Sequence, residues 1–552
     1  MAEIIQAFDL KNLTFQSGDN LLTATALATG LDESVASKEA AYTAEYLTYL
    51  LKSDNTYWVT GVTDVFLKNI IIPSTHNGKP VTGIADAGYT DPETDNTTYS
   101  FAGMSSLVSV VIPSSVKYIG YNAFQNCNNL KSVTIEDPDY YTVYFRNNWG
   151  WTDVHGYYFY DGGSPHAWPG SPLSAVDKVD GCDIYKFTFS KLNWNETTGI
   201  IFNGINDNGE RDQTPDILLK DNSEFCNAVC WEMFYNYQNE VKLFDYDYPS
   251  QLAIGEGAFQ NTGIETINIP YTVKSINYSA FCSSKSLHSV TFSDYCNVKE
   301  ICGCAFEECE ALANITIPAS VKYIGYNAFA CTALTEIIIP SKVENIDSYA
   351  FSGCTSLSRA VIGCENGIIY DAAFAGCISL TSVKFAYPVY ENGVLTALAG
   401  ESNVTAIYER AFADTALTDI AIPRSVTWIG RDAFKNVPLT DGAVFADIYG
   451  WFHTDGEIDE GYEGGDSITP TNIEAFGAKL LNEVLISSGD TSAHNMYKLD
   501  QMPAPTVTIS GSELTIKDST GIAEEFKIFV NGSWKATINA ITGEITFLYG
   551  RN

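Results

Sequence analysis

The side chains best suited to catalysis do not fall into the spacings that catalytic sites need. The six histidines show no HExxH or other metal-ligand spacing, and neither a GxSxG nucleophile motif nor a GxxxxGKS phosphate loop occurs in the chain. Carboxylates are abundant, with 67 Asp and Glu, so a glycosidase pair stays open on numbers alone. We predict a protein that is not an enzyme and has no cofactor.

Cysteines and one acidic loop are the remaining candidates for metal binding. The thirteen cysteines are an odd number, so at least one cannot pair within the chain. Four of them stand three residues after a phenylalanine: Cys127, Cys309, Cys354 and Cys377. A regularly spaced column does not converge on a metal, so we predict small buried side chains there. In the acidic stretch 455–466, Glu460 stands where a calcium loop needs glycine, and we predict a solvated loop and no metal site.

Charge and aromatic content narrow the class of ligand. The 552 residues include 31 Lys and Arg against 67 Asp and Glu, a net charge of −36. Such a chain repels phosphate backbones, and its apolar stretches are shorter than a bilayer span, so we predict no nucleic-acid partner and no membrane insertion. Aromatic residues make up 13% of the chain. They leave rings for contact with neutral carbohydrate, whose C–H faces pack on flat aromatic surfaces.

An Ala-Phe dipeptide recurs along most of the chain. Its copies are Ala123-Phe124, Ala258-Phe259, Ala280-Phe281, Ala305-Phe306, Ala328-Phe329, Ala350-Phe351, Ala373-Phe374, Ala411-Phe412, Ala433-Phe434 and Ala475-Phe476, with Ser100-Phe101 as a weaker copy. From Ala258 to Ala373 the steps are 22, 25, 23, 22 and 23 residues, a period typical of a solenoid. Short alternating apolar runs flank each dipeptide. We predict two small strands per turn around a column of Phe.

The repeat unit resembles a known family. The unit that begins at Ile112-Pro113 and its near copy at Ile317-Pro318 share a Val, an Ile-Gly, the Ala-Phe pair and a Leu at closely matching offsets. This pattern resembles the BspA-like, or Treponema pallidum type, leucine-rich repeats, and we assign residues 55–138 and 248–500 to it. The resemblance implies a leucine-rich-repeat solenoid and the bacterial surface and adhesin roles associated with that family.

The repeats are interrupted between Ala123 and Ala258, where 135 residues stand in place of one period. Within this stretch the apolar alternation predicts strands at 140–145, 155–160, 183–189 and 198–203. We predict an inserted β-sandwich over residues 139–247. Its core is expected to contain Tyr144, Trp149, Trp151 and Phe202.

The order of motifs in the insert resembles the starch-binding carbohydrate-binding modules of family 26. The matching pieces are Val143-Tyr144-Phe145 with Trp151, His155–Phe159, Trp168-Pro169-Gly170, Tyr185-Lys186, Ile201-Phe202-Asn203 and Gln213–Asp216. The resemblance implies that the partner is α-glucan, as starch or maltooligosaccharides. It also implies the carbohydrate-binding residues His155, Tyr157, Trp168 and Gln213, of which His155 replaces the tyrosine usual in the family.

The two ends of the chain do not repeat. Residues 1–54 are expected to cap the solenoid or to anchor the chain to a surface or virion partner, with a short helix over 36–52. Residues 501–552 alternate apolar and polar positions, contain the hairpin signal Asn531-Gly532, and resemble a small immunoglobulin or fibronectin type III-like β-module. The first residues lack the basic and apolar regions of a signal peptide.

We therefore expect a mainly β, non-catalytic protein at the cell surface or outside a bacterium. In this interpretation the solenoid is a rigid arm, and the inserted sandwich binds starch-like α-glucan. One alternative is an adhesin whose solenoid binds a protein or a host glycan. Another is a bacteriophage virion-surface adhesion protein, which the missing signal peptide and the non-repeating ends suggest.

Overall fold

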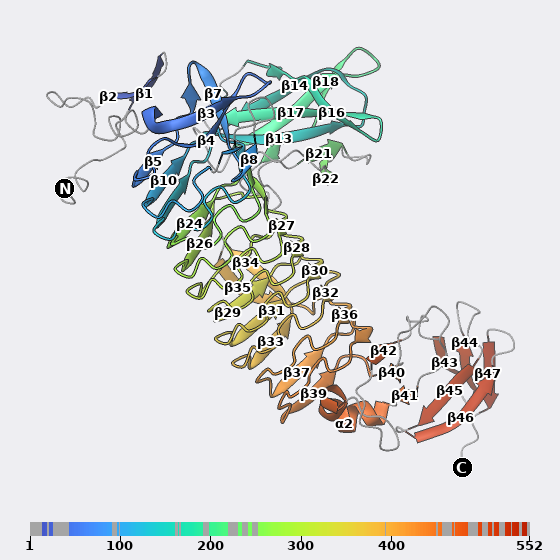
Figure 1. Cartoon of the computed structure of the whole chain (residues 1–552). Helices are drawn as coiled ribbons and strands as arrows, with labels where there is room; N and C mark the ends of the chain where they lie inside the picture. The colour runs from blue at the N-terminus through green and yellow to red at the C-terminus, as the bar shows by residue number, and fades with distance from the viewer. Residues whose placement is uncertain are drawn as a thin grey trace. The chain divides into compact units, whose positions relative to one another are not determined.

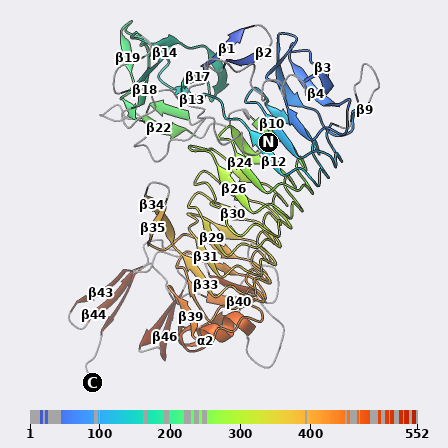
Figure 2. The same ribbon diagram turned by 90° about the vertical axis from the view of Figure 1, so that its left-hand side faces the viewer.

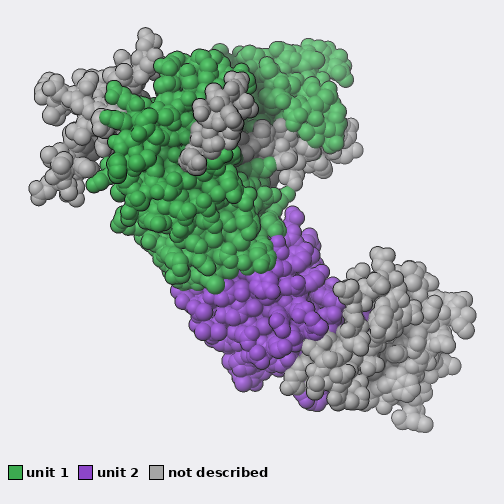
Figure 3. Space-filling model, viewed as in Figure 1, with its two compact units in different colours: residues 1–333 green, residues 334–552 purple. Residues whose placement is uncertain are grey.

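The computed structural model describes most of the chain. The described residues are 14–18, 21–25, 44–90, 97–98, 100–160, 164, 167–190, 198–218, 230–233, 241–244, 252–391, 394–448, 451–454, 466–468, 470–483, 495–498, 506–510, 513–517, 525–530, 533–539 and 544–548. The chain divides into two compact units, residues 1–333 and 334–552, which Figure 3 colours separately. Residues 455–465 of the predicted acidic loop and the Asn531-Gly532 turn lie outside the described residues.

The first unit contains a parallel β-solenoid with two columns of strands (Figure 1). One column is the sheet β4 (Tyr57–Val62), β7 (Lys79–Ile84), β11 (Tyr118–Ile119), β23 (Leu252–Ile254), β25 (Val273–Ile276), β27 (Glu300–Ile301) and β28 (Tyr323–Ile324). The other is the sheet β5 (Asn69–Ile71), β10 (Ser109–Ile112), β12 (Ser132–Ile135), β24 (Thr266–Ile269) and β26 (Ser289–Phe292). The predicted two strands per turn are confirmed. Shorter hairpin pairings involve β1 (Thr14–Gly18) with β2 (Leu21–Thr25), β6 (Thr75–His76) with β7, and β8 (Tyr89–Thr90) with β9 (Thr97–Thr98).

The predicted phenylalanine column forms the centre of this solenoid. The rings stack in the order Phe101, Phe124, Phe259, Phe281, Phe306 and Phe329, with centroids 4.9–5.4 Å apart and interplanar angles of 2–11°. All six side chains are fully buried. Since consecutive rings come from consecutive turns, each turn buries one aromatic face against the next, which is the nearest-neighbour stabilisation expected of a repeat protein.

Each Ala-Phe corner has two backbone positions with positive φ, one two residues before the phenylalanine and one two residues after it. Around Phe124 these are Asn122 (φ 52°) and Asn126 (φ 62°). Gly, Asn, Asp or Ser occupies most of the equivalent positions in other corners. These residues tolerate the left-handed region better than bulky ones do, so the backbone of the corner explains this part of the repeat pattern.

The helix predicted over 36–52 is wrong in its last part. Residues 47–51 form β3 (Leu47–Leu51), which pairs antiparallel with β4 and buries Leu47. The local Ala, Glu and Leu content favoured a helix. The outer edge of β4, however, offers unpaired backbone groups that β3 satisfies, and this tertiary pairing outweighs propensity. Residues 36–43 lie outside the described part of the chain.

The insert consists of two five-stranded sheets that share a core (Figure 1). One sheet has the order β16 (Ala175–Val179), β17 (Cys182–Ser190), β13 (Tyr140–Asn147), β21 (Cys230–Met233) and β22 (Val241–Phe244). The other has the order β15 (Ser171–Pro172), β14 (Thr152–Phe159), β18 (Gly199–Ile205) and β19 (Arg211–Gln213), with β20 (Ile217–Leu218) also on β18. Phe145 of the first sheet stacks on Phe202 of the second at 4.7 Å. The predicted core positions of Trp151 and Phe202 are confirmed, and Trp149 is partly buried against the same core. Tyr144 is buried too, but in a separate small cluster with Ile184 and Cys230, because it points to the opposite face of β13 from Val143 and Phe145.

A tyrosine of the solenoid fastens the insert where it leaves the repeats. The hydroxyl of Tyr271, which follows β24, lies 2.8 Å from the carbonyl oxygen of Pro138 and 2.5 Å from that of Tyr140. Its ring contacts Tyr141 at 5.1 Å. On the next turn, Ser293 donates to the carboxylate of Asp137 at 2.5 Å. The base of the insert is therefore bound to two turns beyond the point of insertion.

The second unit repeats the solenoid pattern (Figure 2). Its columns comprise β30 (Asn345–Ile346), β32 (Ile368–Ile369), β36 (Ala406–Ile407) and β38 (Trp428–Ile429) on one side, and β29 (Glu336–Ile339), β31 (Arg359–Ile362), β33 (Ser382–Phe385), β37 (Asp419–Ile422) and β39 (Gly442–Phe445) on the other. Phe351, Phe374, Phe412 and Phe434 stack at 5.0–5.4 Å. A hairpin of β34 (Tyr387–Glu391) and β35 (Val394–Ala399) interrupts this pattern.

The grouping of Ala475-Phe476 with the repeats is wrong. Both residues lie in the helix α2 (Pro470–Glu483), and Phe476 is exposed. Ile473, Leu480 and Leu481 recur at helical spacing and are buried, and Pro470 is suited to the first turn of a helix. Next to α2, the antiparallel strands β40 (Trp451–Thr454), β41 (Asp466–Ile468) and β42 (Asn495–Lys498) continue the sheet from β38.

The C-terminal residues form short antiparallel pairings. β43 (Thr506–Ser510), β44 (Glu513–Lys517) and β47 (Glu544–Leu548) make a three-stranded sheet, and β45 (Glu525–Val530) pairs with β46 (Ser533–Asn539). This strand content agrees with the expected β-module, and the immunoglobulin-like assignment stays a prediction.

Candidate functional site

The candidate site lies on the outer face of the sheet β15–β14–β18–β19. Along β14, Val154 and Tyr158 face the shared core, so His155 and Tyr157 fall on the opposite, outward side of the strand. The register pairs His155 with Asn203 on β18, and Asn203 with Gln213 on β19. Two strands, β14 and β19, thus place predicted site residues on one face, with Asn203 of β18 between them.

Trp168 and Tyr157 form the aromatic part of the site. Trp168 is 48% exposed and stands in the short turn between Ala167 and Gly170, where the Gly170 N–H donates to the Ala167 carbonyl at 2.9 Å. Its ring meets that of Tyr157 edge to face, with centroids 5.3 Å apart and planes inclined by 72°. The turn therefore presents two rings at an angle rather than as one flat surface.

Glycine lets this turn lie directly on β14. Gly170 has φ +99°, and a Cβ atom built there would come within 2.3 Å of the Gly156 carbonyl oxygen. On the other side of the turn, the Pro169 carbonyl accepts a hydrogen bond of 2.9 Å from the side-chain amide of Asn203, which is fully buried. The position of Trp168 relative to Tyr157 thus depends on a close backbone contact and on one buried amide.

His155 belongs to a polar cluster beside these rings. Its side chain is only 12% exposed, and its Nδ1 lies 2.8 Å from the carbonyl oxygen of Asp153. The guanidinium of Arg211 forms an ion pair with the Asp153 carboxylate and donates to Asn203 Oδ1 at 2.6 Å. The structure therefore brings the exposed ring of Trp168 together with the partly exposed ring of Tyr157, whereas His155 lies largely covered next to the Arg211–Asp153 ion pair. Gln213 is exposed.

Sequence reasoning missed Asp153 and Arg211, and it placed Asn203 only within a motif. The sequence could have indicated Arg211, because residues two apart on a strand share a face and Arg211 is two residues before the predicted site residue Gln213. Asp153 has φ 48° at the start of β14, where the register to β18 shifts between Thr152 and His155. Such an irregularity cannot be read from alternation.

The four regularly spaced cysteines are a second candidate site, for thiol chemistry. The structure shows them instead as buried side chains of the solenoid core. Cys127 is fully buried and its thiol donates to the Phe101 carbonyl at 3.0 Å, while Cys309 contacts the Phe281 carbonyl at 3.2 Å. Burial raises the pKa of Cys127 to about 12. A protonated, hydrogen-bonded thiol is a poor nucleophile and metal ligand. Among the described residues, no group of His, Cys, Asp and Glu could hold a metal ion.

These observations define a class of protein: a β-solenoid that bears an inserted two-sheet module with an exposed aromatic site. Six copies of the BspA type leucine rich repeat region match residues 94–146, 252–381 and 384–445. The model of starch-binding module 26 matches residues 143–218, which include all four predicted site residues. The chain therefore carries BspA type leucine rich repeats over these residues, and residues 143–218 are similar to starch-binding module 26. Both matched families are non-catalytic kinds.

Several solved structures resemble this chain at low identity. A leucine rich cell surface protein from Faecalibacterium prausnitzii is 21% identical, with coverage of 73% of this chain and 75% of that one and a TM-score of 0.28. The pneumococcal vaccine antigen PcpA is 16% identical, with coverages of 73% and 80% and a TM-score of 0.32. The Treponema pallidum leucine rich repeat protein is 16% identical, with coverages of 62% and 79% and a TM-score of 0.22. No curated protein matches the chain.

The helices in the described part of the chain include none with the length and hydrophobicity that a bilayer crossing requires. The leucine-rich-repeat family suggests a surface or extracellular protein. The virion-surface alternative receives no support from the comparisons.

Proposed function

We propose that this protein binds starch-like α-glucan through the outer face of the inserted module and displays that module at a bacterial surface on its repeat solenoid. Tyr157 and Trp168 are the stacking platforms, and Gln213 hydrogen-bonds sugar hydroxyls. The observation that carries the proposal is the pair of adjoining rings, one of them Trp168 at 48% exposure, within the segment that matches starch-binding module 26.

The angle between the two rings favours an α-linked chain. Consecutive sugars of an α-glucan are turned relative to one another, because the linkage curls the chain into a helix. Rings inclined by 72° can each pack against a different sugar of such a curved chain. The nearby charges do not oppose a neutral ligand, since Arg211 and Asp153 compensate each other.

The covered position of His155 limits the strength of the site. A histidine at 12% exposure, held against Asp153, offers little ring surface for stacking. Each platform that removes about 40–60 Å² of sugar surface from water contributes on the order of 1 kcal/mol. Two platforms and a few hydrogen bonds correspond to a dissociation constant between roughly 1 mM and tens of μM. Retention on a polymer then depends on several modules acting together.

The test compares the unmutated chain with its Trp168→Ala variant, by retention on insoluble starch and by titration with maltoheptaose. We expect measurable binding that is lost or weakened about tenfold in the variant. A matched control is Phe66→Ala, which removes another exposed ring from the same unit. No binding by the unmutated chain, or equal binding by Trp168→Ala, would contradict the proposal and favour an adhesin that uses its solenoid.

A further inference from the structure

Three exposed tyrosines occur at equivalent corners of the solenoid in the first unit. Tyr121 is 45% exposed, Tyr278 is 48% exposed and Tyr326 is 45% exposed. Each lies three residues before the buried phenylalanine of its corner. None of them belongs to the phenylalanine column, so their rings do not stabilise the core. We call these three residues the tyrosine row.

The strand register aligns the row along the solenoid. Pairing places Ile119, Ile254, Ile276, Ile301 and Ile324 on consecutive turns of one column. The residues two positions later are Tyr121, Glu256, Tyr278, Gly303 and Tyr326. A tyrosine therefore stands on every second turn. With neighbouring strands about 4.8 Å apart, adjacent tyrosines of the row are spaced by about 10 Å.

Tyr278 shows how such a ring is supported. A Cβ atom built on Gly303, the next corner, would lie 3.0 Å from Cδ2 and 3.1 Å from Cε2 of Tyr278. The ring therefore rests against the backbone of the following turn, where the neighbour has no side chain. The Cys304 thiol lies 3.5 Å from the Tyr278 hydroxyl, and this contact raises the pKa of Tyr278 to about 12. The phenol stays neutral under physiological conditions.

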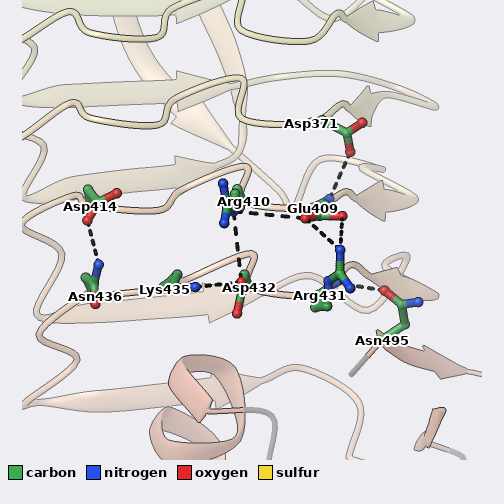
Figure 4. Close-up of polar contacts among 9 residues, drawn as sticks. All are labelled: Asp371, Glu409, Arg410, Asp414, Arg431, Asp432, Lys435, Asn436 and Asn495. Atoms are coloured by element: carbon green, nitrogen blue, oxygen red, sulfur yellow. Dashed lines mark hydrogen bonds and ion pairs between the residues drawn. The ribbon is translucent and has the colours of Figure 1, made fainter. Parts of the chain in front are cut away.

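The fold itself does not require an aromatic residue at this corner position. In the second unit the equivalent positions hold Asp371, Glu409 and Arg431 (Figure 4). There Asp371 accepts from the Glu409 N–H at 3.1 Å, and Arg431 Nη2 lies 3.1 Å from Glu409 Oε1. Those corners close with charged side chains, of which Arg431 pairs with Glu409 and Asp371 accepts from a backbone N–H. The exposed rings of the first unit therefore need another explanation than corner formation.

The charges beside the row indicate what it can bind. Glu256 is exposed between Tyr121 and Tyr278, and Asp86 on the preceding turn accepts from the Tyr121 N–H at 2.7 Å. These carboxylates disfavour an anionic partner and accept hydrogen bonds from hydroxyl groups. Aromatic faces with flanking acceptors suit a neutral sugar, which offers C–H surfaces and hydroxyl donors together.

We propose that the tyrosine row is a second carbohydrate site, for an extended, neutral, β-linked polysaccharide that lies along the solenoid. A straight chain of this kind shows the same ring face at every second sugar, and its rings then meet tyrosines on every second turn. A curled α-glucan cannot stay in contact with three platforms in a line. The row thus differs in ligand from the site on the inserted module, and it goes beyond the function proposed for that module.

The test titrates the full chain with cellohexaose, an extended β-linked glucan oligomer, and in parallel with maltoheptaose. We expect cellohexaose to bind the unmutated chain, Tyr278→Ala to weaken this binding about fivefold, and Tyr121→Ala with Tyr278→Ala to weaken it further. Tyr278→Phe keeps the ring and should keep most of the affinity. All these variants should bind maltoheptaose unchanged, and circular dichroism should confirm that they are folded.

Two controls separate this site from the one on the insert. Phe66→Ala removes an exposed ring outside the row and should leave cellohexaose binding as it was. Trp168→Ala should affect maltoheptaose alone. The inference is overturned if the unmutated chain does not bind cellohexaose, or if Tyr278→Ala binds it as tightly as the unmutated chain does. Loss of maltoheptaose binding alone would count only against the function proposed for the insert.

Discussion

Replacing Gly170 by alanine should separate the two rings of the candidate α-glucan site. Gly170 has φ +99°, and the added Cβ would lie 2.3 Å from the Gly156 carbonyl oxygen and 3.0 Å from the Tyr157 Cα. These are backbone atoms, so no side chain can turn away. The first distance is roughly 1 Å short of ordinary van der Waals contact, and the turn that holds Trp168 must move off β14 by about that amount.

The size of the effect follows from the strain and from the surface of Trp168. Alanine in this left-handed conformation costs about 1–3 kcal/mol of folding free energy. A tryptophan presents roughly 250 Å² in all, and 48% of Trp168 is exposed. A sugar that covers one face of this exposed part removes about 60 Å² from water, or about 1.5 kcal/mol. Loss of this stacking corresponds to an affinity for maltoheptaose that is about tenfold weaker.

A matched control separates strain from displacement. Gly181 lies in the same insert at φ +79°, and a Cβ built there meets nothing within 4 Å. Gly181→Ala should therefore lower the free energy of unfolding by a similar conformational cost while it leaves maltoheptaose binding unchanged. Titration calorimetry and denaturant unfolding of both variants measure the two quantities. If both variants bind as the unmutated chain does, the close contact of the turn with β14 does not position Trp168, and the reasoning is refuted.

Three further predictions concern the solenoid. Phe281→Ala removes one ring from the buried stack and should cost about 3–5 kcal/mol of unfolding free energy, measured by denaturant titration; a loss below 1 kcal/mol would contradict the stack's role. Asn126→Val places a β-branched residue at φ 62° and should destabilise by about 2 kcal/mol, whereas Asn128→Val, nearby in the same exposed loop, should cost little; equal losses would count against corner strain. Burial raises the pKa of Cys127 and of Cys364 to about 12 in the fold. A thiol whose pKa is higher in the folded than in the unfolded state stabilises the fold as long as it stays protonated. This stabilisation should be complete below pH 9 and be lost as the pH rises toward 12. Unfolding at pH 7 and pH 10.5 measures it, and alkylation of Cys127 at pH 8 without unfolding would contradict the burial.

Much of the fold could be predicted because its signals are local and repeated. The Ala-Phe period identified the solenoid turns, and alternation located the strands that became β13, β14, β17 and β18. Trp151 and Phe202 lie in the predicted core of the insert, whereas Tyr144 is buried on the other face of its strand, in a separate cluster with Ile184 and Cys230. The prediction failed at β3 and at Ala475-Phe476, where a short local pattern was compatible with two structures. There, pairing with β4 and the helical spacing of Ile473 and Leu480 decided the outcome.

The candidate site was predicted in its residues but not in its geometry. Family resemblance named His155, Tyr157, Trp168 and Gln213, and alternation could place the first two on one face of a strand. It could not show that Arg211 and Asp153 lie against His155, because these contacts join β14 to β19 and depend on an irregular register at the start of β14.

By itself, the sequence determined which residues form the repeated strands, corners and core of the solenoid, since periodicity and backbone tolerance act over a few neighbouring residues. Only the tertiary structure decided which residues from distant turns share a surface. The tyrosine row is the clearest case: Tyr121 and Tyr278 are separated in the chain by the whole insert, yet strand pairing puts them two turns apart on one column. The physical reason is that solenoid register is set by hydrogen bonds between turns, so an insertion lengthens the chain without altering the stacking of the turns on either side.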